Sequence, residues 1–352
     1  MAYTTIDDSS AHFQTALYTG TGSSLSITND GNSDLQPDVC WIESRSSSTY
    51  NNILTDSTRG STKVLTVQGT DTEANVTNSI TSYNTDGFTL GTWGHVNYNG
   101  VTYVAWQWKV NGGTTSSNTD GTISTTIQTN SDAGFSICRH DGNGTAGATF
   151  GHGLGVKPSF IISKRTDSIT NWRCYHSSLG ATKHILLNTD GASVTSTDTW
   201  NNTEPTSSVV TVGSSSRTNA SGSPILFYVF AEKQGFSKFG SYVGNGSTTD
   251  GPFVYTGFKP AFVMIKATDA VKNWTIFDNK RYYNGNMYYI YANSITNEGE
   301  SPSSGAHIDF LSNGFKIYDN WTLTNQNTVN YIYMAFAENP FVTSTGIPTT
   351  AR

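Results

Sequence analysis

The sequence predicts an all-β protein made of three tandem β-sandwich modules, jelly-roll or lectin-like in type and related by an internal repeat. Composition is the first reason, because only 13% of the 352 residues are charged and 12% are aromatic. Aromatic and β-branched residues favour strands, and abundant glycine serves the turns that connect them. A strand that occurs three times and turn signals at short intervals are the second and third reasons.

The repeated strand is a proline followed by a nearly continuous apolar segment. Such a segment, short and rich in β-branched and aromatic residues, is typical of a strand buried on both faces. Proline suits the first position of a strand, because it has no N–H to donate to a neighbour. The three copies are residues 36–43, 157–164 and 259–266. Each copy is expected to form the centre of a packed unit.

Other segments recur around this strand in the same order. An opening strand ends at a Gly-x-Gly turn, a polar–aromatic strand and a shorter strand follow the proline-led one, and an apolar strand closes the unit. The opening strands are 13–22, 135–144 and 236–246, the polar–aromatic strands are 51–56, 171–176 and 273–278, the shorter strands are 63–65, 183–187 and 287–290, and the closing strands are 103–108, 227–232 and 331–338. Asp86-Gly87 and Asn313-Gly314 are strong hairpin signals in the first and third units. The second unit has residues 208–212 there, without the glycine.

These repeats predict a division of the chain into six parts. They are an N-terminal extension (1–12), module 1 (13–110), a Gly/Ser/Thr linker with a lead-in strand (111–132), module 2 (133–233), module 3 (234–341) and a C-terminal tail (342–352). Pro37, Pro158 and Pro260 lie 121 and 102 positions apart, and the excess of the first interval falls in the linker. Because the linker composition is typical of flexible coil, we expect a loose joint after module 1, a rigid joint after module 2 and a separate core in each module.

Charge and cysteine content exclude several classes of protein. The formal net charge of −6 argues against a nucleic-acid binder, which needs a basic face. The N-terminus has no basic, apolar pattern of a signal peptide, and no apolar segment approaches the length of a membrane span. Cys40 lies inside a predicted core strand, and three cysteines cannot all pair within one chain. A small buried thiol made in a reducing cytoplasm fits this pattern.

The sequence offers no catalytic motif. None of the seven histidines forms a helical i, i+4 pair, and His140 and His152, which flank a glycine-rich turn, are better explained by loop polarity than by metal binding. Asp56 and Asp278 end equivalent strands where the second unit has His176, whereas a glycosidase needs two carboxylates across one cleft. We therefore predict that the chain is not an enzyme and has no catalytic residues, metal ligands or cofactor.

Aromatic residues in loops are the better functional signal. The candidate residues are Trp93, Tyr98, Trp200 and Trp321, which lie in polar segments rich in Asn and Asp. An exposed Trp or Tyr can anchor a protein interface or stack on a sugar ring. Each can also cap the open end of its own sandwich, and this last reading is favoured over the interface and the glycan.

The three units resemble a repeated β-sandwich module of unknown function in virion structural proteins of marine tailed bacteriophages, of the cyanophage and pelagiphage type. The resemblance rests on residues 235–266, 308–316 and 331–341 in the third unit, 151–158 and 178–183 in the second, and 56–63 and 86–91 in the first. Two features depart from it. Glu43 stands where the other copies have Lys164 and Lys266, and the second unit lacks the Asn-Gly hairpin. Either departure marks a module that docks on another subunit, or it reflects drift.

The resemblance implies a particle component and no reaction. It suggests a virion protein on the particle exterior that decorates or stabilises the capsid, with other capsid or tail subunits as partners and self-association into a homo-oligomer as a further option. The alternative is a tail or fibre protein that recognises host surface glycans. A heptad or collagen-like segment of the kind that often trimerises fibres is not found in the sequence, which lowers the fibre reading.

Overall fold

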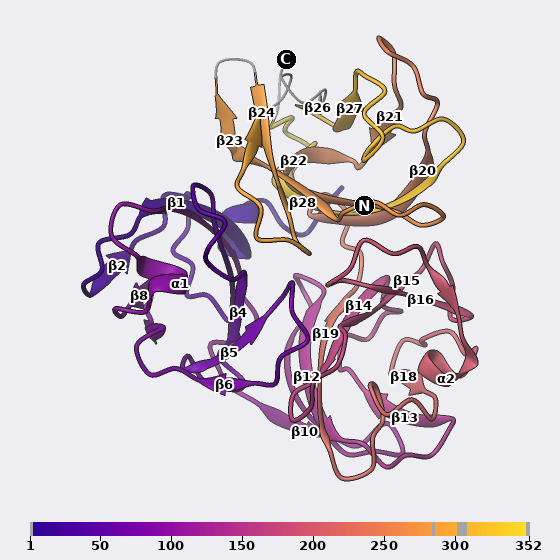
Figure 1. Ribbon diagram of the computed structural model, residues 1–352. Coiled ribbons are helices and arrows are strands. Elements are labelled where there is room, and N and C mark those ends of the chain that lie inside the picture. Colours follow the sequence, from indigo (N-terminus) through magenta and orange to yellow (C-terminus); the bar gives the residue numbers. More distant parts are fainter. Residues whose placement is uncertain (1–2, 284–285, 301–307, 350–352) are drawn as a thin grey trace.

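The computed structural model describes residues 3–283, 286–300 and 308–349, and their regular structure is almost entirely β-strand. Helical structure among these residues is limited to η1 (Ser9–Ala11), α1 (Gly94–Asn97) and α2 (Thr197–Trp200). The all-β class predicted from composition is therefore confirmed. Figure 1 shows three groups of strands around a common centre, following each other from indigo through magenta to orange and yellow. We call them repeat 1 (13–110), repeat 2 (111–233) and repeat 3 (234–341).

Each repeat contains one large sheet, and the three large sheets share one strand order. In repeat 1 the order is β1 (Phe13–Thr19), β9 (Thr102–Trp108), β3 (Val39–Ser44), β4 (Ile53–Asp56), β5 (Lys63–Thr66) and β6 (Ala74–Asn75). In repeat 3 it is β20 (Ser237–Val243), β28 (Asn330–Pro340), β22 (Phe258–Ala267), β23 (Thr275–Tyr283), β24 (Asn286–Tyr291) and β25 (Gly299–Glu300). All neighbouring strands in these sheets are antiparallel, as hairpin-rich sequences favour.

The large sheet of repeat 2 has the same six strands and two more. The six are β12 (Phe135–Asp141), β19 (Pro224–Phe230), β14 (Phe160–Arg165), β15 (Arg173–His176), β16 (Lys183–Leu186) and β17 (Val194–Thr195). The extra strands are β10 (Ser116–Asn118) and β11 (Thr125–Asn130), and β11 pairs with the outer edge of β12. The predicted lead-in segment is thus built into a sheet.

A small sheet accompanies each large one. The small sheets are β2 (Leu25–Ile27), β8 (Phe88–Leu90) and β7 (Ile80–Tyr83) in repeat 1, β13 (Ala148–Gly151) and β18 (Val209–Val212) in repeat 2, and β21 (Phe253–Tyr255), β27 (Gly314–Ile317) and β26 (Ile308–Leu311) in repeat 3. The Asp86-Gly87 and Asn313-Gly314 signals do connect paired strands, β7 with β8 and β26 with β27. In repeat 2 the chain instead forms α2 before β18.

The repeated apolar strands lie at the centre of the large sheets and are buried on both faces, as predicted. Every residue of β3 is buried, and so are all but one residue in each of β14 and β22. The placement of proline is only partly as expected. Pro37 and Pro158 lie just before β3 and β14, whereas Pro260 is inside β22, where a register shift against β28 accommodates a residue without an N–H.

One face of each large sheet in repeats 1 and 2 packs against its own small sheet. In repeat 1, Phe88 and Leu90 of β8 belong to one buried cluster with Cys40 and Ile42 of β3. The corresponding cluster of repeat 2 joins β13 and β18 to β14 and β19. These two clusters are the local cores that a short-strand repeat must bury to be stable.

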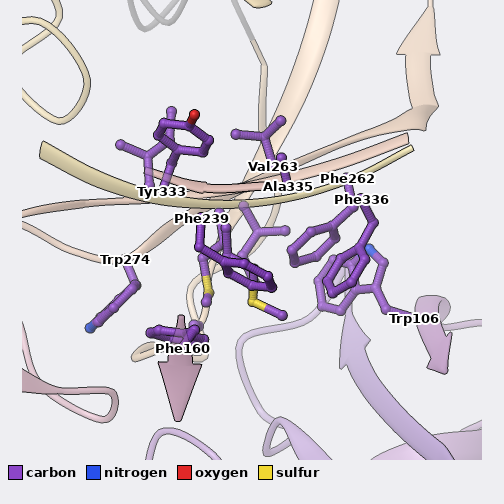
Figure 2. Packing of buried hydrophobic residues seen from close by; sticks show 14 of the residues in the cluster. Trp106, Phe160, Phe239, Phe262, Val263, Trp274, Tyr333, Ala335 and Phe336 are labelled. Atoms are coloured by element: carbon purple, nitrogen blue, oxygen red, sulfur yellow. The ribbon is translucent and has the colours of Figure 1, made fainter. Parts of the chain in front are cut away.

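The other face of all three large sheets contributes to one shared core, so the expectation of separate cores is met only in part: repeats 1 and 2 have local cores, and all three repeats share this one. This cluster includes Trp41 and Trp106 of repeat 1, Phe160 of repeat 2, and Phe262 and Phe336 of repeat 3. Figure 2 shows Phe262 and Phe336 on the side of β22 and β28 that faces Trp106 and Phe160, whereas Val263, Ala335 and Tyr333 point to the opposite side. Trp106 meets Phe262 edge-on, with ring centres 5.6 Å apart. Each such buried aromatic side chain stabilises the fold by about 1.5–3 kcal/mol.

Backbone hydrogen bonds close the three sheets into a ring. The N–H just before the last strand of each large sheet donates to a carbonyl just after the central strand of the next repeat. The pairs are Glu73 N to Thr166 O at 2.8 Å, Ser193 N to Thr268 O at 2.8 Å, and Glu298 N to Arg45 O at 2.9 Å. Because repeat 3 returns to repeat 1, the head-to-tail contacts close within one chain, as they would in a cyclic trimer.

A second set of three bonds uses side chains at one equivalent position. Trp172 Nε1 donates to Thr66 O at 3.0 Å, Trp274 Nε1 donates to Leu186 O at 2.8 Å, and Asn52 Nδ2 donates to Tyr291 O at 3.3 Å. Each donor comes just before the strand that follows the central one, and each acceptor lies in the neighbouring repeat. Asparagine in repeat 1 thus keeps the bond that indole groups make in repeats 2 and 3.

A third set links the last residues of β4 and β15, and Asp278 within β23, to the closing strand of a neighbouring repeat. Tyr228 OH donates to Asp56 Oδ2 at 2.7 Å, Trp106 Nε1 donates to Asp278 Oδ2 at 2.9 Å, and His176 Nε2 lies 3.2 Å from Tyr333 O. Met334 stands in repeat 3 where Trp106 and Tyr228 stand in the others, and it has no proton to donate. His176 reverses the direction, because its N–H donates to a backbone carbonyl.

The joint between repeats 1 and 2 is tight, so the loose joint expected from the composition of residues 111–132 is wrong. The Gln128 carboxamide of β11 donates to the Ser57 and Thr58 hydroxyls at 3.0 and 2.8 Å, and accepts from the Asn111 N–H at 3.0 Å. Asp38 accepts further N–H groups of the same segment, at residues 110, 112 and 113. Long-range pairing of this kind overrides the coil preference of a Gly/Ser/Thr sequence.

Replacing Tyr228 with Phe is expected to weaken the whole chain and not only one third of it. The change removes a donor from a buried oxygen of Asp56, which costs about 1–3 kcal/mol of unfolding free energy. Because the repeats share a core, Trp fluorescence and circular dichroism should report one transition with one lowered midpoint. The exposed Tyr98→Phe variant is the control and should unfold like the unmodified protein. Separate transitions for separate repeats would contradict the shared core.

Candidate functional site

Two of the four predicted aromatic residues serve the interior of their own repeats. Trp200, in α2, is 1% exposed and packs edge-on against Tyr175 with ring centres 6.0 Å apart, so its prediction as a surface contact residue is wrong. Trp321 is half-buried against the shared core and contacts Tyr289 at 4.7 Å between ring centres. Both act as caps, which was the favoured reading of the four residues.

The other two belong to an aromatic surface on repeat 1, where Trp93 is half-buried and also packs against the local core of that repeat. This aromatic surface consists of Tyr50, Trp93, His95 and Tyr98. His95 lies in α1, Trp93 and Tyr98 flank it, and Tyr50 lies in the loop after β3. Trp93 contacts His95 at 4.6 Å, Tyr50 contacts Tyr98 at 5.3 Å, and Tyr50 meets His95 edge-on at 5.9 Å, all between ring centres. Tyr98 is 53% exposed. The aromatic surface is therefore the candidate functional site.

Hydrogen bonds fix the backbone beneath the aromatic surface. The hydroxyl of Tyr103, from β9, donates to Gly94 O at 2.7 Å and accepts from the Tyr98 N–H at 3.0 Å. The His95 ring accepts from the Asn51 N–H through Nδ1 at 2.8 Å, and partial burial lowers the pKa of this histidine. The backbone that carries these rings is thus fixed before any ligand arrives, and the lowered pKa favours the neutral form of His95 at neutral pH. Such a surface can stack on a sugar ring or on apolar side chains of a protein.

Three asparagines that sequence reasoning missed hold the loops at this end of each repeat. Asn97, Asn219 and Asn325 are each fully buried. Their side-chain oxygens accept from the N–H groups of Thr21, Asn143 and Asn245, and their amide groups donate to carbonyls of nearby loops. The sequence signal that identifies these residues is an asparagine six positions before the second residue of β9, β19 and β28. Trp93 and Trp321 hold equivalent positions, because each is the first residue of the turn that ends at this asparagine.

The two carboxylates considered for catalysis hold the ring together. Asp56 binds Arg59 at 2.6 Å and Asp278 binds Arg281 at 2.7 Å, with all four side chains at most 1% exposed. Burial alone would lower the pKa of Arg59, but the charge of Asp56 outweighs it and raises that pKa. Each carboxylate also accepts from a neighbouring repeat, so its oxygens are used by the fold. The pair forms no two-sided cleft of the kind that glycoside hydrolysis needs.

The two histidines considered for metal binding, His140 and His152, are buried within repeat 2. His140 is buried in β12, with its ring centre 5.0 Å from that of Phe150 and 5.2 Å from that of Phe227, so loop polarity does not explain it. Tyr18 and Tyr242 hold the same position in repeats 1 and 3. His152 accepts from the Leu154 N–H at 3.2 Å. In residues 3–283, 286–300 and 308–349, no cluster of His, Cys, Asp and Glu side chains could hold a metal ion.

Glu43 and its lysine counterparts lie inside the ring, so Glu43 does not mark a docking surface. Lys164 Nζ donates to Thr70 O at 2.9 Å and Lys266 Nζ donates to Asp190 O at 3.0 Å, each across a joint. Burial lowers the pKa of both lysines to about 8. Glu43 is fully buried, and burial raises its pKa despite the indole N–H of Trp41 that donates to it at 2.7 Å.

The three thiols are free and buried, as expected for Cys40 from its place in a core strand. Burial raises the pKa of each of them, and that of Cys138 lies at about 12. Thiolate chemistry at neutral pH is thereby suppressed. No helix in the part of the chain that the structure describes is both long and apolar enough to cross a membrane.

One family spans nearly the whole chain, from residue 8 to residue 340. The chain belongs to the family described as a domain of unknown function, DUF7483. No curated protein and no solved structure matches the chain. The DUF7483 match covers all three repeats as one unit, which agrees with a shared core and a ring that closes only when the third repeat is present.

Acid should destabilise the protein through His176. Its Nδ1 accepts from the Ser178 N–H at 3.1 Å, so Nε2 carries the proton that is donated to Tyr333 O. Burial lowers the pKa of His176 to about 4. The unfolded chain therefore binds more protons between about pH 6.5 and pH 4, and the free energy of unfolding should fall as the pH falls through that window. For this residue alone the loss is on the order of 3 kcal/mol.

The measurement is urea unfolding at several pH values for the unmodified chain and for His176→Gln. Glutamine can donate to the same carbonyl and does not titrate, so the variant should show a smaller loss between pH 6.5 and pH 4. His140 and His184, whose pKa values burial also lowers to about 4, contribute to the dependence that remains, together with other shifted groups such as His152. Identical pH profiles for the two proteins would contradict this assignment.

The two classes of predicted aromatic residue should separate in stability. Trp200→Ala leaves a large cavity in the repeat 2 core and is expected to cost about 3–5 kcal/mol. Tyr98→Ala removes an exposed ring and should change the unfolding free energy by less than about 0.5 kcal/mol. Thermal unfolding measured by circular dichroism compares the two variants directly. A large loss for Tyr98→Ala would show that the aromatic surface exists for stability.

Proposed function

We propose that the chain is a non-enzymatic structural protein of a bacteriophage particle. It is displayed on the exterior of the virion, after synthesis in the bacterial cytoplasm, and it decorates or stabilises the capsid through contacts with other subunits. The sequence resemblance to repeated modules of marine phage virion proteins supports this proposal. We also propose that each repeat is one β-sandwich module, a reading supported by the clusters that join large and small sheets in repeats 1 and 2.

The observation that carries the proposal is the closed ring. Its buried ionisable groups bond across joints between repeats, as Asp56 does with Tyr228 and Asp278 with Trp106. Because its buried polar groups stabilise the closed ring, the chain is suited to a mechanical role in which a rigid body presents fixed surfaces. The low share of charged residues, 13%, suits a passive exterior coat.

A tail or fibre protein that recognises host surface glycans is the second candidate. The aromatic surface favours it, because Tyr98 is exposed and the Tyr103 hydroxyl bonds the Tyr98 N–H and the Gly94 carbonyl, which fixes the backbone that carries the ring. A sugar ring can stack on such a face while nearby amides bond its hydroxyls. Self-association and glycan binding both remain compatible with this surface.

Antibody–gold labelling of intact phage particles, viewed by electron microscopy, tests the proposal. We expect label over the head, at a copy number that saturates, because decoration occupies equivalent lattice sites. Antibody first absorbed with the purified chain is the matched control and should leave particles unlabelled. Unlabelled particles would overturn the virion assignment. Label on the tail would favour the second candidate, and Tyr98→Ala would then be tested for weaker binding to host cells.

A further inference from the structure

A groove of about 210 Å³ lies at the joint between repeat 3 and repeat 1. One wall is the start of β1, at Phe13 and Thr15, with residues 30–32 beside it. The opposite wall is formed by Asn279, Lys280 and Asn339 of repeat 3. The other two joints are spanned by the chain itself, through residues 109–134 and 231–236, whereas this joint has no covalent link.

In the joint between repeats 1 and 2, strand β11 occupies the equivalent place. Thr15 and Ile137 are equivalent, because they pair with Trp106 and Tyr228 at the same position of the closing strands. Gln128 of β11 lies directly opposite Ile137. A strand added to the outer edge of β1 would put its own side chain opposite Thr15 in the same way.

The groove wall matches the residues that hold Gln128. The Gln128 carboxamide bonds Ser57, Thr58 and Asn111 at the joint that β11 fills. Asp278 and Phe336 of repeat 3 are equivalent to Asp56 and Trp108 of repeat 1. Counted from them, Asn279, Lys280 and Asn339 hold the positions of Ser57, Thr58 and Asn111, and these three residues form one wall of the groove. The groove is therefore the counterpart of a filled carboxamide site.

Two observations show that hydrogen-bonding groups on the β1 side of the groove lack partners among the described residues. β1 is the last strand of its sheet, so it presents an unpaired edge, which is the usual template for an added strand. Thr15 is only 5% exposed, and its hydroxyl has no hydrogen-bond partner among the residues that the structure describes. A buried polar atom without a partner is unfavourable, and a docked donor or acceptor would supply the missing hydrogen bond.

Asp8 and Ser10 of the N-terminal segment belong to the lining of the groove, whereas the residues nearest the two described ends are bound outside it. Tyr3 OH donates to Gly257 O at 2.5 Å, and Ser344 N donates to Asp7 at 2.6 Å. One ion pair borders the groove, between Lys280 and Asp30 at 2.7 Å, and these side chains are 38% and 70% exposed. An exposed pair of this kind contributes little to stability, so an incoming strand can displace it.

We propose that this groove is a strand-addition site for an extended segment of a partner polypeptide. The segment pairs antiparallel with β1 and places a carboxamide side chain, Gln or Asn, opposite Thr15. The chemistry of the occupant follows from residues 125–130, which are uncharged, rich in Thr and carry one Ile and one Gln. That the partner is another virion subunit rests on the proposed function, whereas the site itself rests on the repeat geometry alone.

A synthetic peptide with the sequence of residues 124–131, blocked at both ends, is the probe. It is titrated into the ¹⁵N-labelled full chain, and amide shifts are followed by NMR. We expect saturable shifts at Phe13, Thr15 and the side-chain amide of Asn279. A second peptide carrying Gln128→Ala loses the carboxamide bonds and should bind about tenfold more weakly.

Matched variants of the protein locate the site. Asn279→Lys puts a long side chain into the groove and should weaken binding at least as much as the peptide change does. Ser177→Lys, at the same exposed position of repeat 2, should leave binding unchanged. If Asn279→Lys does not fold, titration of the two peptides into the unmodified chain still tests the proposal.

Three results would overturn the proposal. They are no shift at millimolar peptide, shifts confined to another surface, and equal affinity of the Gln128→Ala peptide. None of them bears on whether gold label is found on particles, so a failure here is distinct from a failure of the virion assignment. Binding of the peptide together with unlabelled particles would keep the strand site and assign its partner to another assembly.

Discussion

Closure of the ring is the constraint on which the rest of the structure depends. Each large sheet is apolar on both faces, and a small sheet can cover only one of them. The second face is covered only when three such sheets meet, as Trp106, Phe160 and Phe262 do at the centre. Because a sheet with one face exposed to water would lose much of its burial energy, no repeat is complete without the other two. The three repeats of this single chain are thus arranged like the subunits of a cyclic trimer.

Sequence changes at the joints preserve the bonds rather than the residues. Where Asp56 and Asp278 pair with Arg59 and Arg281, repeat 2 has His176, and the residue three positions later is Leu179, packed against the shared core. A buried ion pair is replaced by a neutral ring and an apolar side chain, which avoids an uncompensated buried charge. An internal repeat frees each copy to diverge in this way, provided that the joint still closes.

The sequence predicted what depends on local pattern. Apolar runs became buried strands, and Asp86-Gly87 became a hairpin turn, since both signals act over a few residues. It could not predict the shared core, because the same apolar face fits a separate core and a common one. It also misjudged residues 111–132, whose pairing depends on Gln128 meeting Ser57 far along the chain. Trp200 was misplaced because burial follows from α2, which forms where the other repeats begin a hairpin.

The three joints are unlike in one respect that bears on function. Strand β11 fills the first joint, and a short direct connection, with the Lys233 N–H bonded to Ser237, spans the second. The third holds the groove beside Thr15, on the end strand β1; the second joint also has an end strand, β20, but the apolar Phe239 stands there at the position of Thr15. A body with three similar sides would bind a partner equally well in three orientations. One open joint breaks that equivalence, so a partner strand inserted there fixes a single orientation of the ring on the surface that carries it.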